Sequence, residues 1–167
     1  MVHAREEVQA TVDRYVDVRR RIDQGELGWD ALAQFFTDDV VYIDPAWGRI
    51  QGLDEVSSFF VDSMKGLEDW TFPIEYAAIE GETVVVKWWQ ITPGERPGGG
   101  PYVQSGISTL HYAGDGKFDY EEDLLNMVHV LDDLRESGWR PGEGFQPPPP
   151  DPVRDFSRPG GPAPGWH

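Results

Sequence analysis

Three carboxyl groups stand at positions where an acidic side chain could move a proton. Asp44 ends the apolar run Val40–Asp44 and precedes Pro45, which favours an extended backbone at Asp44. If this strand lines a cavity, desolvation raises the pKa of Asp44 toward that of a useful general base; the alternative is a solvated carboxylate that begins an Asp-Pro turn. Glu121 and Asp123 share one face of any strand that holds them, and close carboxyls push one of their two pKa values upward.

The sequence leaves open which way that face points. With one parity, Glu121 and Asp123 point into the cavity as a candidate acid and base. With the other parity, Phe118, Tyr120 and Leu124 point inward, and the acidic residues belong to a solvated run of charge.

Apolar residues at helical spacing predict a first helix that carries Tyr15 on its buried side. Val8, Val12, Tyr15 and Val16 form this stripe. A phenol in an apolar wall can stabilise negative charge that develops on a substrate oxygen. The alternative is a core tyrosine bonded to a backbone carbonyl.

The other elements are predicted from periodicity and turn residues. Two more helices are expected within residues 29–36 and 54–64, strands at 40–44, 70–79, 83–92, 102–113 and 117–124, and a closing helix at 124–138. The hairpin signal Gly114-Asp115-Gly116 joins the last two strands. Helices followed by a strand meander predict an α+β fold, with a curled, mostly antiparallel sheet and helices over a cavity.

Lys87 selects the inward face of the strand at 83–92. Because an unpaired buried lysine is costly, we expect the opposite face, with Trp88 and Gln90, to point inward. Trp88 would then be either a wall of the cavity or plain core packing, and Gln90 a polar group at its mouth.

The composition changes at Gly138. Residues 138–167 hold nine of the 14 prolines and six of the 19 glycines, which disfavours a regular helix or strand. We therefore divide the chain into a folded domain, residues 1–137, and a Pro/Gly-rich tail, residues 138–167. The tail is either a disordered end or a segment anchored by its aromatic residues, Trp139, Phe145, Phe156 and Trp166.

Five segments carry a resemblance to a known family: VDRYV at 12–16, FTDD at 36–39, IDP at 43–45, Gly52, and FFVDSMK at 59–65. Together they look like ketosteroid isomerase and, more broadly, the SnoaL-like group of the nuclear-transport-factor-two superfamily. The likeness covers residues 8–125. It implies a conical α+β barrel, commonly a homodimer, with an apolar cavity between the sheet and the N-terminal helices. This fold hosts isomerases, cyclases, hydrolases and proteins that only bind.

The resemblance also implies roles for particular residues. Asp44 matches the isomerase general base and Tyr15 its oxyanion donor, while the second donor position falls on Ser108. Asp123 falls where limonene epoxide hydrolase has a catalytic aspartate and where polyketide cyclases of this fold place an acid, with Glu121 beside it. The candidate substrate contacts are Trp47, Phe60, Trp88, Gln90, Tyr102 and Ser108.

Composition narrows the class of protein. The net charge of −16 and the pI of about 4.4 make nucleic acid and anionic membranes poor partners. There is no Cys, and neither His111 nor His129 has a partner at metal-ligand spacing, so we expect no metal and no cofactor. The sequence has no apolar run long enough for a membrane span or a leader, so we expect a cytoplasmic protein.

These observations lead to one hypothesis and one alternative. The hypothesis is a SnoaL-like enzyme that acts by general acid–base catalysis on a small hydrophobic molecule (steroid, polyketide or terpenoid), as an isomerase, cyclase or hydrolase. Asp44 would be the base, and Tyr15, Asp123 or Glu121 the donors or acids. The alternative is a non-catalytic protein of the same fold that binds a hydrophobic ligand or serves in assembly.

Overall fold

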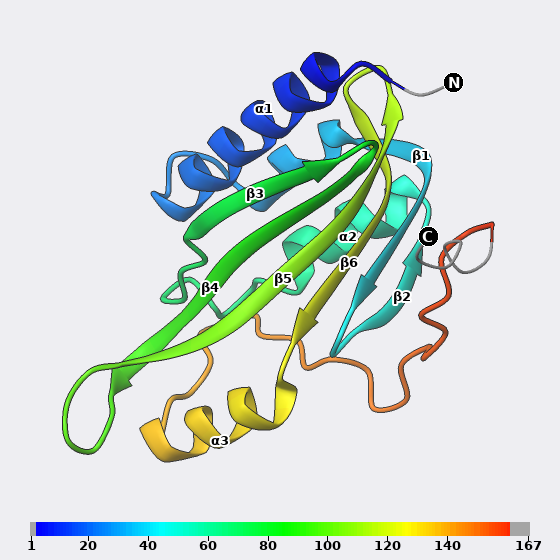
Figure 1. Ribbon diagram of the computed structural model, residues 1–167. Coiled ribbons are helices and arrows are strands. Elements are labelled where there is room, and N and C mark those ends of the chain that lie inside the picture. Colours follow the sequence, from blue (N-terminus) through cyan, green and yellow to red (C-terminus); the bar gives the residue numbers. More distant parts are fainter. Residues whose placement is uncertain (1–2, 161–167) are drawn as a thin grey trace.

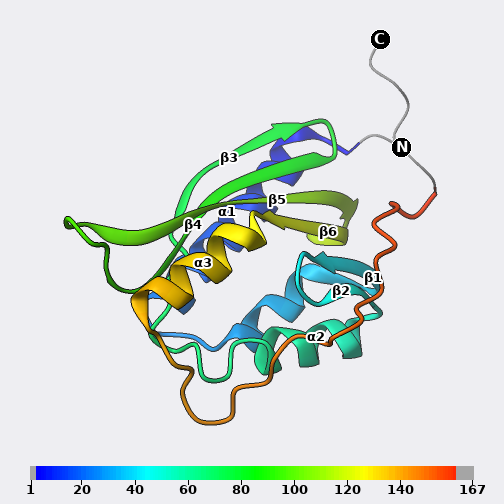
Figure 2. The same ribbon diagram turned by 90° about the horizontal axis from the view of Figure 1, so that it is seen from below.

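The computed structural model describes residues 3–160 of the 167-residue chain and shows a curled six-stranded sheet with helices on its concave side (Figures 1 and 2). The strand order is β2-β1-β6-β5-β4-β3, and neighbouring strands are antiparallel except for the parallel pair β1 and β6. The predicted α+β fold is therefore confirmed.

The elements in chain order are α1 (Arg5–Asp23), the 3-10 helix η1 (Trp29–Phe35), β1 (Phe36–Asp44), β2 (Gly48–Gln51), α2 (Leu53–Asp62), β3 (Ile74–Glu80), β4 (Thr83–Glu95), β5 (Pro101–Gly114), β6 (Lys117–Leu125) and α3 (Met127–Ser137).

The apolar stripe of α1 packs into the core and places Tyr15 there, as predicted. The stripe continues beyond Val16, the last residue expected, because Arg19 and Ile22 are buried as well. Acidic residues in the first turn and basic residues in the last turn suit the helix dipole. α1 thus presents a phenol and a guanidinium, four residues apart, to the interior.

The inner face of β4 carries Trp88 and Gln90, as the position of Lys87 predicts. Both side chains are buried, with 4% exposure each. Lys87 lies on the opposite face, where its Nζ donates to the backbone carbonyls of Trp88 (2.7 Å) and Gly106 (3.2 Å) and lies 3.8 Å from the ring centre of Trp89. These contacts compensate its charge outside the cavity.

A β-bulge in β6 brings residues of both parities to the inner face. The pairing with β5 shifts by one residue, and Asp119 is the extra residue between Phe118 and Tyr120. Phe118 and Glu121 are therefore both buried on the inside, although an unbroken strand would place them on opposite faces. The parity with Glu121 and Asp123 inward therefore holds after the bulge. Of the alternative set only Phe118 points inward, since Tyr120 packs with Val41 and Ile43 in a separate cluster and Leu124 is exposed.

Several elements differ from the sequence-based expectation: β4 extends to Glu95, α3 begins at Met127 rather than at residue 124, and three larger differences concern β1, β2 and β3. β2 was not predicted, because its four residues contain a single large apolar side chain; it forms by antiparallel pairing with β1. β1 begins at Phe36, four residues earlier than expected. β3 begins at Ile74, since Thr71 makes only an isolated bridge to Ile91.

The described part of the tail, residues 138–160, packs against the body. It leaves α3, passes α2 and reaches the edge of the sheet at β2 (Figure 2). The rings of Trp139 and Trp70 are 5.2 Å apart, and farther along the Arg49 backbone N–H donates to the Val153 carbonyl at 3.0 Å. These contacts favour the anchored alternative.

The anchoring aromatics are not equivalent. Trp139 and Phe145 contact each other with ring centres 6.5 Å apart, whereas Phe156 is 47% exposed. Trp166 lies outside the described residues. The first half of the tail therefore makes the aromatic contacts.

A matched pair of glycine variants tests how closely the tail is docked. A Cβ at Gly66 would lie 2.8 Å from both the Gly142 carbonyl and the Phe145 Cβ, whereas a Cβ at Gly25 would meet nothing within 4 Å; both glycines have positive φ. Both alanine variants incur backbone strain of about 1 kcal/mol, but only Gly66→Ala crowds the tail. We expect faster hydrogen exchange at the Gly142 amide in Gly66→Ala alone. Equal exchange rates in the two variants would contradict tight docking.

Candidate functional site

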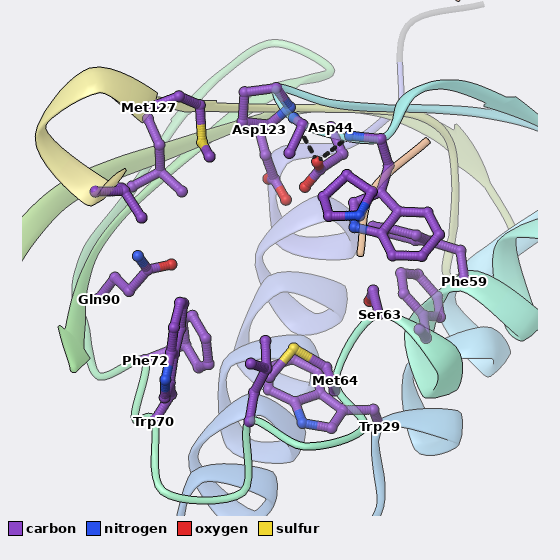
Figure 3. Close-up of a pocket in the computed structure, with 18 of the residues that line it drawn as sticks. Trp29, Asp44, Phe59, Ser63, Met64, Trp70, Phe72, Gln90, Asp123 and Met127 are labelled. Carbon is purple, nitrogen blue, oxygen red and sulfur yellow. Dashed lines mark hydrogen bonds between the residues drawn. The ribbon is translucent and has the colours of Figure 1, made fainter. Parts of the chain in front are cut away.

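A cavity of about 250 Å³ lies between the inner face of the sheet, η1, α2, α3 and the first part of the tail (Figure 3). The carboxyl groups of Asp44 and Asp123 lie side by side at one end, and Met64 and Trp29 stand opposite. Apart from the aromatic residues, six lining side chains bring polar groups: Arg19, Asp44, Ser63, Gln90, Asp123 and Gln146. The aromatic lining consists of Trp29, Tyr42, Trp47, Phe59, Phe60, Trp70, Phe72, Trp88, Trp139 and Phe145.

Asp44 is held by its own turn and still lines the cavity. Its Oδ1 accepts hydrogen bonds from the backbone N–H groups of Ala46 (2.7 Å) and Trp47 (2.8 Å). Burial, with a smaller contribution from the charge of Asp123, raises the pKa of Asp44 to about 6, although the two backbone donors oppose the shift. The side chain is therefore mostly ionised at pH 7 and close enough to neutrality to accept and return a proton.

Asp123 is oriented by two hydroxyl groups. Tyr42 Oη donates to Oδ2 and Ser108 Oγ donates to Oδ1, each at 2.5 Å. The Trp88 indole N–H donates in turn to Ser108 Oγ at 2.9 Å, which fixes the direction of the serine hydroxyl. Burial raises the pKa of Asp123, while the two hydroxyl donors favour its ionised form.

Glu121 lies behind Asp123 and is 1% exposed. Tyr15 Oη donates to its Oε1 at 3.1 Å, and Arg19 Nη1 donates to Tyr15 Oη at 3.1 Å. Burial and then the charge of Asp123 raise the pKa of Glu121 well above its ordinary range. The pKa values of both carboxyls are therefore shifted upward by burial, and the two groups influence each other's titration.

The residues singled out from the sequence fall into three groups. Asp44, Trp47, Phe60, Trp88, Gln90 and Asp123 line the cavity. Tyr15, Ser108 and Glu121 stand behind the lining: Ser108 bonds to Trp88 and Asp123, Tyr15 bonds to Arg19, and Glu121 bonds to Tyr15. Tyr102 is buried on the inner face of β5 but does not line the cavity. Its Oη donates instead to Glu136 at 3.1 Å.

Sequence reasoning missed two polar residues of this site, Arg19 and Tyr42. Arg19 belongs to the run Arg19–Arg21, which is typical of a solvated helix face, but it is four residues after Tyr15 and so falls on the same helical stripe. Tyr42 is two residues before Asp44 and therefore shares its face of β1. Both signals were present in the spacing.

Within residues 3–160, the structure shows neither a metal-binding cluster nor a membrane-spanning helix. No group of three or more His, Cys, Asp and Glu side chains in this range is arranged to hold a metal ion. No helix in this range combines the length and the apolar character needed to cross a membrane.

Comparisons with known proteins agree with this architecture. The SnoaL-like domain family matches residues 10–120. A solved structure described as a candidate SnoaL-like polyketide cyclase from Jannaschia sp. CCS1 gives a TM-score of 0.61 at 16% identity, covering 84% of this chain and 99% of its own. No curated protein matches the chain significantly.

Two further solved structures have named ligands or pathways. The epoxide hydrolase/cyclase-like enzyme SalBIII, which has a role in pyran ring formation in the polyether salinomycin, gives a TM-score of 0.56 at 18% identity, covering 74% of this chain and 94% of its own. The structure of TerC, co-crystallised with polyporic acid, gives a TM-score of 0.57 at 14% identity, and the match covers 75% of this chain and 98% of TerC. Because these three structures are only 14–18% identical to the chain, their similarity shows a shared fold alone.

Proposed function

Since the chain belongs to the SnoaL-like domain family, we propose that it is an enzyme that moves protons on a small hydrophobic carbonyl compound without a cofactor. The observation that carries this proposal is the pairing of Asp44 and Asp123 at one end of an otherwise aromatic cavity. Both carboxyls are partly buried among apolar side chains. Such an environment moves carboxyl pKa values toward those useful in general acid–base catalysis.

In this proposal Asp44 is the base. Its Oδ1 is occupied by two backbone N–H groups, so Oδ2 is the oxygen that takes the proton from a carbon next to the substrate carbonyl. The C–H bond breaks, its electron pair forms an enolate, and Asp44 becomes neutral. The proton then returns to a different carbon in an isomerisation.

Asp123 provides the acid for a cyclisation. When the enolate carbon attacks a second carbonyl, a C–C bond forms and the new alkoxide needs one proton. In this proposal the buried Glu121–Asp123 pair shares one proton, and Asp123, the member that lines the cavity, delivers it to the alkoxide. Asp44 then gives its proton to solvent, and the pair takes one back. The cyclase-like and hydrolase-like neighbours of this fold support a reaction of this kind, in which Tyr42 and Ser108 keep Asp123 in place.

The proposal is tested with a flat ketone that has an acidic C–H bond next to its carbonyl, such as 2-tetralone. In D₂O, the purified protein should accelerate the loss of the α-proton signal in ¹H NMR relative to buffer. Binding of 2-tetralone without faster exchange would instead identify a non-catalytic ligand-binding protein. If the protein neither binds 2-tetralone nor accelerates the exchange of its protons, the assignment of the cavity to carbonyl compounds is wrong.

A further inference from the structure

Arg19 is a buried cation that uses little of its hydrogen-bonding capacity. A guanidinium has five N–H donors. In the described part of the chain, Arg19 makes one side-chain hydrogen bond, from Nη1 to Tyr15 Oη, and takes part in none of the ion pairs. Its side chain is 8% exposed and lines the cavity. Buried charges normally find hydrogen-bonding partners, so the unused donors face a position that a ligand can fill.

Aromatic rings set the shape of that position. The guanidinium carbon lies 5.7 Å from the ring centre of Trp29 and 5.9 Å from that of Trp88, and both rings line the cavity. These rings hold the planar group in place by cation–π contacts. A flat ligand that lies against this aromatic lining would bring an oxygen on its edge to the free N–H groups.

Tyr15 cannot provide the same contact while its hydrogen bonds are in place. Its Oη accepts from Arg19 and donates its single proton to Glu121. Glu121 and Asp123 balance part of the charge of Arg19 from a distance, but neither accepts a hydrogen bond from it in the described residues. The guanidinium is therefore the cationic donor that reaches the cavity.

We propose that Arg19 binds a carboxylate or enolate oxygen of the ligand, so that the substrates of this site are flat aromatic compounds bearing such an oxygen. The inference rests on the proposed function only in using the same cavity. It adds a group that stabilises the negative oxygen formed when Asp44 removes a proton. It also makes Arg19 a residue that determines ligand specificity.

The test compares two ligands of the same size that differ in charge, 2-naphthoate and 2-naphthalenemethanol. Their dissociation constants are measured by calorimetry at about pH 8 with the full-length protein. We expect the wild type to bind the carboxylate at least tenfold more tightly than the alcohol. Arg19→Met should remove this preference while still binding the alcohol, and Arg19→Lys should retain part of it.

Arg21→Met is the matched control, because Arg21 lies on the same helix but pairs with Glu26 at an exposed position. The preference should survive in this variant. Loss of the preference in Arg21→Met, its survival in Arg19→Met, or failure of 2-naphthoate to bind the wild type would each overturn the proposal. If thermal melting shows that Arg19→Met does not fold, the Arg19→Lys variant decides the question: its preference for the carboxylate over the alcohol should be smaller than that of the wild type.

This experiment is independent of turnover. A protein that binds 2-naphthoate through Arg19 but does not exchange the protons of 2-tetralone would refute the proposed reaction and leave the ligand class standing. A protein that exchanges the protons of 2-tetralone but does not prefer 2-naphthoate would support the proposed reaction and refute the ligand class.

Discussion

Asp44→Asn is expected to slow the exchange of the 2-tetralone α-protons by about 10²–10⁴-fold, the usual contribution of a positioned general base. The amide oxygen can still accept from the backbone N–H groups of Ala46 and Trp47, so the turn should persist. What the variant lacks is a group that can take the proton. The rate is measured by ¹H NMR in D₂O at several protein concentrations.

The matched control is Asp38→Asn, an exposed aspartate on the same strand. Its exchange rate should equal that of the wild type. The wild-type rate should also rise with pH through about 6, where Asp44 ionises, and then level off, since the ionised form is the active one. Undiminished exchange in Asp44→Asn would remove Asp44 from the mechanism.

The same substitution is expected to stabilise the protein by up to about 3 kcal/mol at about pH 8. The pKa of Asp44 rises from an ordinary value of 3.8 to about 6 on folding, and each unit corresponds to about 1.4 kcal/mol. The folded protein thus holds the proton more tightly than the unfolded chain does. Its stability therefore falls as the pH rises from about 4 to about 6, and Asn, which is neutral throughout, avoids that loss.

Urea unfolding of both proteins between about pH 4 and pH 8 measures this effect. The stability difference should be small at the acidic end, grow through the window between the two pKa values and stay constant above about pH 6. A difference that does not vary with pH, or a variant less stable than the wild type at about pH 8, would show that Asp44 is not strained by burial. Asp38→Asn serves as the control for an Asp-to-Asn change at an exposed position of the same strand.

Periodicity was enough to predict most of the fold. The stripe on α1 and the inward face of β4 follow from local spacing and from the cost of burying Lys87, and both are as expected. β2 could not be predicted, because a four-residue strand with one large apolar side chain depends on its partner β1. The bulge at Asp119 is likewise set by pairing with β5, so spacing within β6 alone could not give the direction of Glu121.

The candidate site was less predictable than the fold. The sequence identified Asp44, Asp123 and Glu121 as the acids worth examining, and the structure places all three at or behind one end of the cavity. It could not give the hydrogen-bond partners that orient Asp123, because Ser108 comes from another strand. Arg19 was missed for a different reason: a cluster of arginines normally indicates a solvated helix face, and this expectation outweighed the spacing that puts Arg19 on the buried stripe, where Trp29 and Trp88 pack around it.

The docked tail has a consequence for how this cavity can change. Trp139, Phe145, Gln146 and Pro148 supply part of the lining from a segment outside the core, whereas the acids stand on strands whose packing supports the whole molecule. Replacements in the tail can therefore reshape the space offered to a ligand at little risk to folding, while the proton-moving groups stay where they are. Shortening the protein at Gly138, as though its proline-rich end were dispensable, would yield a cavity with a different selectivity.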